Sequence, residues 1–273
     1  MNRIADNFGR FFVFAIMVFA ATFLFLPIIV SITMSFDSRD YLGQFPPPSF
    51  SMQWYVKFFS DDFYLAGLRT SLLLAVLSTV ISTAAGVSAA LVIDRFRFRG
   101  RDEVTTFFMS PLIVPSVVVG FSLLLFLATV GVFDGFTRLL AGHVIITIPY
   151  TIRTTLAGMI GIKPSLVEAA LSLGANEQEA FWDVVFPLAR TGIVAGAVFA
   201  FAFSMDDVAV SLFLTDPDSY TLPVALISAM RANFDLAIAA AAVLLMGLTV
   251  ALIIVLEKLI GLDRIIGQGI YRG

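Results

Sequence analysis

The sequence lacks cysteine altogether, contains a single histidine, His143, and has few charged residues for its length. The absence of cysteine excludes disulfides, thiolate metal sites and a cysteine nucleophile, and a single histidine excludes a multi-histidine metal centre. No GxxxxGK(S/T) phosphate-binding loop occurs, so the chain is not expected to hydrolyse a nucleotide. These absences argue against an enzyme, and they predict that this chain holds no metal and no cofactor of its own.

Apolar residues dominate the composition. Of 273 residues, 59% are hydrophobic and 14% are charged, against roughly 25% charged in an average soluble domain. About 20 apolar residues cross the hydrocarbon core of a bilayer, and the first apolar stretch, from Phe11, is too long for the core of a cleavable signal peptide. We predict an all-α, polytopic membrane protein whose residues 1–273 form a single transmembrane domain surrounded by lipid, with no nucleic-acid partner. The six predicted transmembrane helices cover residues 11–36, 70–93, 104–133, 139–162, 191–215 and 236–256.

The distribution of basic residues predicts the orientation of these helices. Twelve of the 17 lysines and arginines fall in the four segments that would share one side of the membrane with both termini. Basic residues in short loops remain in the cytoplasm, so both termini are predicted to be cytoplasmic. The run from Arg95 to Arg101, in which Phe96, Phe98 and Gly100 separate four arginines, is the strongest topological anchor. The four segments are residues 1–10, 94–103, 153–190 and 257–273.

A polar insert at residues 163–190 lies on this predicted cytoplasmic side, between the fourth and fifth predicted spans. Ser165 is a plausible N-cap with Glu168 three residues later, which is the pattern of a capping box. Gly174 can adopt positive φ and end this first helix sharply, and a second short helix over 175–185 should stop before a proline. Two short helices joined by a tight turn would form a rigid lever lying across the membrane plane.

Two adjacent acids, Asp206 and Asp207, interrupt the fifth predicted span. At 1.5 Å per residue they lie about 24 Å from its cytoplasmic start, where a charge costs about 2.5–3.5 kcal/mol. Such acids are expected to face a water-filled cavity, a basic side chain or a cationic substrate; alternatively, they cap a broken helix. If the helix is continuous, Asp207 lies near a face of small residues suited to close helix packing and points into the bundle, whereas Asp206 points about 100° away, towards a rim. That face comprises Gly192, Gly196, Ala200 and Ser204, and Ser211 follows it.

Several motifs together resemble a known family. The frame Glu-Ala-Ala, then glycine, then a hydrophobic run closed by proline is similar to the EAA coupling loop of type I (MetI-like) ABC importer permeases. From the second predicted span to the end of the chain, the sequence resembles more narrowly the second permease subunit of spermidine/putrescine importers. The motifs that carry this resemblance are Asp94–Gly100, Glu168–Pro187, Phe203–Val208, Ser211–Thr215 and Leu222–Pro223. Near the end of the EAA frame, Val184 and Phe186 replace the family's isoleucine and leucine, both hydrophobic for hydrophobic.

The resemblance implies a function and a set of partners. The chain would be the membrane subunit of a bacterial inner-membrane importer, with two separate ATP-binding subunits that hold ATP and Mg, a second and paralogous permease subunit, and a periplasmic or surface substrate-binding protein. The cargo would be a polyamine or similar small cation; alternatives are an amino acid, an opine or an aminophosphonate. A gradient-driven secondary transporter is the rival of another class, but the internal repeats that it predicts are not visible. The residues implied to couple to the ATPase are Glu168, Ala169, Ala170, Gly174 and Pro187, and those expected to line the substrate path are Asp207, Asp206, Ser204 and Ser211.

Overall fold

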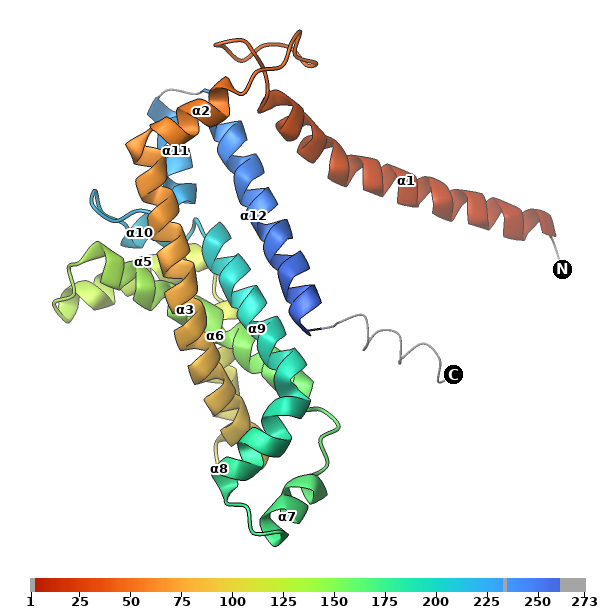
Figure 1. The fold of residues 1–273 in the computed structure, drawn as a ribbon, viewed down its shortest axis with the longest axis vertical. Coiled ribbons are helices and arrows are strands. Elements are labelled where there is room, and N and C mark those ends of the chain that lie inside the picture. The colour runs from red at the N-terminus through yellow and green to blue at the C-terminus, as the bar shows by residue number, and fades with distance from the viewer. Residues whose placement is uncertain (1–2, 233–234, 261–273) are drawn as a thin grey trace. The chain divides into compact units, whose positions relative to one another are not determined.

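A computed structural model describes residues 3–232 and 235–260 of the chain. Within these residues the secondary structure is helical, apart from one antiparallel bridge between Asp37 and Phe50. Arg264 and Arg272, which contribute to the prediction of a cytoplasmic C terminus, lie outside the described residues. The helices are α1 (Arg3–Met34), α2 (Gln53–Ser60), α3 (Asp62–Arg95), α4 (Arg101–Met109), α5 (Ser116–Thr129), α6 (Gly135–Met159), α7 (Pro164–Ser172), α8 (Glu177–Ala180), α9 (Phe186–Asp206), α10 (Ser211–Leu214), α11 (Leu222–Ala232) and α12 (Ala237–Ile260), with a 3-10 turn at Ser110–Leu112 and a π turn at Phe181–Val185 (Figure 1).

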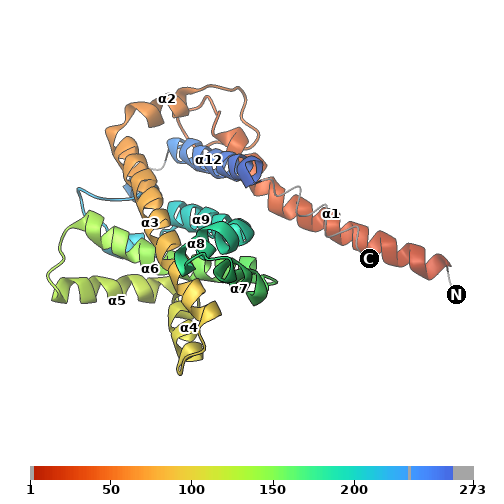
Figure 2. The same cartoon turned by 60° about the horizontal axis from the view of Figure 1, so that its bottom comes forward.

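Four helical stretches in the described part of the chain are long and apolar enough to cross a membrane. They are Arg10–Met34, α3, α6 and the unbroken run Glu177–Asp206. A fifth is added if α4 and α5 form one span, but the chain bends by 104° between them. Figure 2 shows that the two helices run in different directions. Pro111 and Pro115 lie at this bend, where proline removes backbone donors and sterically blocks a straight helix. The described apolar stretches of α11 and α12 are shorter, so six spans remains a prediction.

The chain divides into two compact units: residues 1–62 with 226–248, and residues 63–225 with 249–273. In the second unit, α3, α6 and α9 lie side by side (Figures 1 and 2). Small residues allow this close approach: a Cβ on Gly158 would lie 2.8 Å from the Cα of Gly192, and a Cβ on Gly86 would collide with Thr151. Gly192, Gly196, Ala200 and Ser204 are all buried on α9, which confirms the predicted small-residue face. Such faces are the usual means of helix packing in membranes, where burying apolar surface from lipid gains little.

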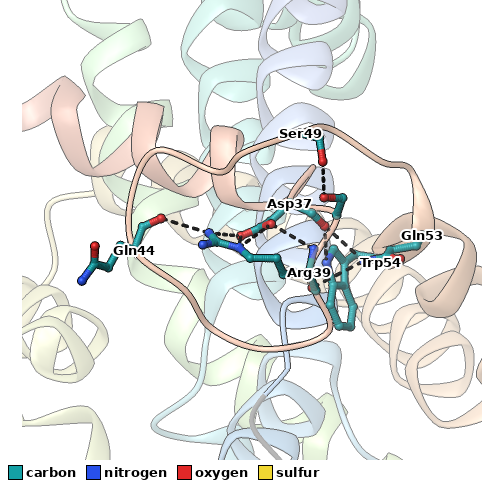
Figure 3. Close-up of polar contacts among 7 residues, drawn as sticks. Asp37, Arg39, Gln44, Ser49, Gln53 and Trp54 are labelled. Atoms are coloured by element: carbon teal, nitrogen blue, oxygen red, sulfur yellow. Dashed lines mark hydrogen bonds and ion pairs between the residues drawn. The ribbon is translucent and has the colours of Figure 1, made fainter.

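The first unit contains a tightly bonded loop between α1 and α2 (Figure 3). The guanidinium of Arg39 forms an ion pair with the Asp37 carboxylate, whose side chain is fully buried, and donates 2.9 Å to the carbonyl oxygen of Gln44. The Trp54 indole donates 2.8 Å to the Asp37 carbonyl, and Gln53 donates 3.2 Å to the same oxygen. Hydrogen bonds from Arg39 hold the pKa of the Asp37 carboxyl below its usual value, although burial acts in the opposite direction. The loop is therefore held by a charged pair as well as by backbone contacts.

This ion pair predicts how the loop responds to acid. Because the pKa of Asp37 is lower in the folded loop than its ordinary value of 3.8, the pair stabilises the loop fully above that value and loses its effect as the pH falls through the lower folded pKa. We expect protease accessibility of residues 38–52 to be constant from pH 8 to about pH 5. Asp37→Asn should raise that accessibility already at neutral pH. If the Asn variant is cleaved at the wild-type rate, the ion pair does not order the loop.

Candidate functional site

The polar insert begins with α7, which starts differently from the sequence prediction. Its N-cap is Lys163 in extended conformation, Pro164 occupies the first turn, and no side chain caps the helix. Proline suits this position because its fixed φ matches the helix and its missing N–H would be unpaired there anyway. Proline thus starts the helix ahead of Ser165, and the predicted capping box between Ser165 and Glu168 is wrong. Glu168 is exposed, and in the described part of the chain its carboxylate has no hydrogen-bond or ion-pair partner.

The turn after α7 follows the prediction. Gly174 adopts φ +97°; its N–H donates 3.0 Å to the Leu171 carbonyl, and the Ala175 N–H donates 3.1 Å to the Ala170 carbonyl. This pair of bonds is a Schellman motif, which satisfies the last carbonyls of a helix and requires a residue with positive φ. Leu173, beside the turn, is 90% exposed. The turn therefore presents an apolar side chain outwards on a fixed backbone.

The second half of the insert is not a separate short helix. Asn176 and Glu179 form a capping box, with bonds of 2.9 and 2.8 Å between each side chain and the other residue's N–H. From Glu177 the helix continues through the π turn into α9, so the predicted stop before Pro187 is wrong. A π turn widens the backbone just where the ring of Pro187 would otherwise meet the carbonyl four residues earlier. The insert is thus one short helix, a glycine turn, and the start of a long membrane helix.

A buried polar network lies deeper in the same unit, around His143 on α6. His143 is fully buried; its Nδ1 lies 2.7 Å from the Ser204 hydroxyl and its Nε2 lies 2.9 Å from the Ser211 hydroxyl. Ser211 donates its hydroxyl to Asp207 at 2.9 Å, so the Ser211 oxygen is left to accept from Nε2–H. Ser78 on α3 in turn donates to Ser204 at 3.2 Å. Counting donors and acceptors, this chain of bonds is complete with a neutral imidazole protonated at Nε2.

Asp207 lies in the break between α9 and the short helix α10. Its carboxylate accepts from the Ser211 N–H at 2.8 Å, in addition to the Ser211 hydroxyl, and its side chain is only 4% exposed. The α9 helix ends at Asp206, because Asp207 adopts an extended conformation, so the helix is not continuous over residues 191–215, which was the condition for the argument from helical angles. The alternative that the pair caps a broken helix agrees with these contacts. Asp207 is buried and Asp206 is exposed, as predicted, although the cause is the cap rather than helical angles.

The role of His143 was missed by sequence reasoning, although a signal for it exists. His143, Thr147, Thr151 and Thr155 recur every four residues on α6 and are all buried, which marks a polar stripe facing other helices. The Thr147 hydroxyl lies 2.6 Å from the Ser82 hydroxyl, and Thr151 donates 2.8 Å to the Ser82 carbonyl on α3. Hydroxyl stripes of this kind join helices inside membranes. The described residues contain no cluster of three potential metal ligands from His, Cys, Asp and Glu.

Residues 82–262 match the family described as "Binding-protein-dependent transport system inner membrane component". The chain belongs to this family. It is a permease subunit of an ABC importer, a membrane channel component rather than a catalytic enzyme.

Among its relatives, the permease is 32% identical over 247 residues to "Spermidine/putrescine transport system permease protein PotC" of Shigella flexneri, covering 90% of this chain and 92% of that protein. It is 29% identical to "Putrescine transport system permease protein PotI" of Escherichia coli (strain K12), covering 85% of this chain and 84% of that protein. A bacterial alginate ABC transporter, solved in complex with a pentasaccharide-bound periplasmic protein, matches 94% of this chain and 96% of that chain, with a TM-score of 0.72 at 16% identity. That likeness supports the fold alone.

Proposed function

We propose that this permease forms part of the translocation path of an ATP-driven importer for polyamines such as spermidine or putrescine. The proposed cargo rests on the similarity over about nine-tenths of the chain to a spermidine/putrescine permease, together with a second similarity to a putrescine permease. A carboxyl pair at the α9–α10 break agrees with a cationic cargo, because acids within membrane helices commonly mark the path of a cation.

The partners follow from the same proposal. Two ATP-binding subunits would supply ATP and Mg, a second and paralogous permease would complete the path, and a periplasmic or surface binding protein would deliver the cargo. Both termini and the insert at 163–190 would face the cytoplasm. Glu168, Ala169, Ala170, Gly174 and Pro187 would then form the surface and frame that grip the ATPase. The exposed Glu168 carboxylate and the outward-facing Leu173 are among the exposed side chains of this segment that are available to such a partner.

One reconstitution tests cargo and energy source together. The permease, purified with its co-expressed subunits and placed in proteoliposomes, should hydrolyse ATP faster when its binding protein carries spermidine or putrescine. Amino acids, opines and aminophosphonates are tested in the same way, and stimulation by one of these alone would replace the polyamine proposal. Uptake by the lone chain, driven by an ion gradient without ATP, would instead establish the secondary transporter.

The coupling role of the insert predicts a separation of activities. Glu168→Arg should leave the subunits assembled but reduce uptake by roughly a hundredfold, because reversing a charge at a protein contact costs several kcal/mol. Uptake and ATP hydrolysis are measured on the same proteoliposomes. Ser165→Ala is the matched control on the same helix, and it should behave as wild type because Ser165 caps nothing. Normal uptake by Glu168→Arg would remove Glu168 from the coupling surface.

A further inference from the structure

A pocket of about 560 Å³ lies in the second unit, between the end of α3 and α7. Four basic residues line it: Arg95, Arg97, Arg101 and Lys163. Three acids, Asp94, Glu168 and Glu177, line the same pocket. Within the described residues, none of these seven side chains forms an ion pair with another. A pocket lined by unpaired acidic and basic side chains suits a ligand that carries both a positive and a negative charge.

A second, apolar pocket of about 680 Å³ adjoins the first, because Asp94 lines both. Its walls come mainly from the bend after α4 and the last turns of α6. Six of the nine lining residues are apolar, namely Met109, Leu112, Ile113, Leu156, Ala157 and Ile160; Asp94, Thr105 and Arg153 complete the lining. Polar and apolar pockets that meet at one residue match the two parts of an amphipathic molecule, one part charged and the other a hydrocarbon chain.

The location of the charged pocket agrees with a membrane interface. It lies where the membrane-spanning α3 ends, and the exposed Phe96 and Phe98 alternate with its arginines. Apolar rings beside basic side chains are typical of segments that lie in the headgroup region. Arg101, the first residue of α4, lines this pocket, and α4 begins without a side-chain cap; the N-terminus of a helix favours a phosphate.

We propose that these joined pockets bind one phospholipid with an amine-bearing headgroup, such as phosphatidylethanolamine. The phosphate is held by Arg97 and Arg101, since guanidinium groups bind phosphate oxygens in paired hydrogen bonds. The primary ammonium is within the pocket that the three acids line, and one acyl chain occupies the apolar pocket. Because Glu168 lines the charged pocket, the lipid also touches the segment proposed to bind the ATPase. This inference concerns a bound lipid and does not depend on which cargo is carried.

Lipid carried through purification tests the proposal directly. The permease is purified with its co-expressed subunits in mild detergent, and extracted lipid is measured by mass spectrometry. Wild type is expected to retain about one phosphatidylethanolamine per chain. Arg97→Gln with Arg101→Gln should retain roughly tenfold less, a loss that corresponds to about 1.4 kcal/mol. Arg99→Gln is the matched control, because Arg99 belongs to the same run but does not line the pocket.

A second variant addresses the acyl chain without altering charge. Ala157→Trp fills the apolar pocket and should also lose the lipid, which keeps the test informative if the double arginine variant does not fold. Equal retention of phosphatidylcholine or phosphatidylglycerol, or equal retention by all variants, would overturn the proposal. So would displacement of the lipid by free phosphoethanolamine alone, which would indicate a soluble ligand. Ala157→Cys, unique in this cysteine-free chain, distinguishes a lipid-filled groove from a subunit interface: cross-linking to the second permease would also overturn it.

Discussion

Asp207→Ala is expected to abolish uptake and to lower the melting temperature of the permease. The change removes the acceptor of the Ser211 N–H and hydroxyl in a buried site, and each buried donor left unpaired costs about 1–3 kcal/mol. The break between α9 and α10 then loses its cap, and His143 loses the hydroxyl orientation that completes its own bonds. Transport in proteoliposomes and thermal unfolding of the purified complex measure the two effects.

Asp207→Asn separates the cap from the charge. The amide oxygen can still accept the Ser211 bonds, so melting should change little, but we expect polyamine uptake to be lost with the negative charge. Asp206→Asn is the matched control: Asp206 is exposed, and its substitution should leave the cap and the melting temperature unaltered. Undiminished transport by Asp207→Asn would reduce Asp207 to a structural cap.

Gly192→Leu is expected to prevent assembly of the folded permease. The Cβ of a side chain at this position would already collide with the Thr154 carbonyl and would lie 2.7 Å from the Cα of Gly158. The backbone atoms cannot move aside as a flexible side chain can. The loss of folding free energy should therefore exceed the value of about 1–3 kcal/mol that is typical of overpacked cores. The yield of monodisperse protein and its melting temperature measure the effect.

A second glycine provides the control for helix propensity. Gly247 lies inside α12, and no atom of the described residues lies within 4 Å of a Cβ built there. Gly247→Leu should be neutral or stabilising by up to about 1 kcal/mol, because leucine favours a helix over glycine. Equal behaviour of the two variants would mean that close contact between α6 and α9 does not hold the fold.

The sequence predicted best those features that depend on local backbone chemistry or on periodicity. Gly174 ends α7 with positive φ, and the four-residue repeat from Gly192 identifies the buried face of α9. The predicted caps and helix ends were wrong where two local sequence signals favour different structures. Pro164 starts α7 in place of Ser165, and Pro187 is accommodated by a π turn instead of stopping a helix.

The network around His143 could not be predicted because its members are far apart in the sequence. Ser78, His143 and Ser204 lie on three different helices, and a lone histidine carries no sign of which hydroxyls it meets. The four-residue polar stripe on α6 predicts a buried face but not its partners. The break at Asp207 differs, because Asp207 and Ser211 are only four residues apart in the sequence. A side-chain cap and a continuous helix compete at this position, so the sequence left both alternatives open.

The uninterrupted helix from Glu177 to Asp206 connects the insert at 163–190 directly to the buried network around His143. Its 30 residues span about 45 Å at 1.5 Å per residue, and its one described irregularity is the π turn near the insert. Beyond that turn, the 21 residues of α9 extend about 30 Å. A tilt of about 10° at Phe186 would displace Asp206 by about 5 Å at this length. Small angular motions about the π turn would therefore become side-chain-sized displacements beside His143, because no further irregularity is described between Phe186 and Asp206.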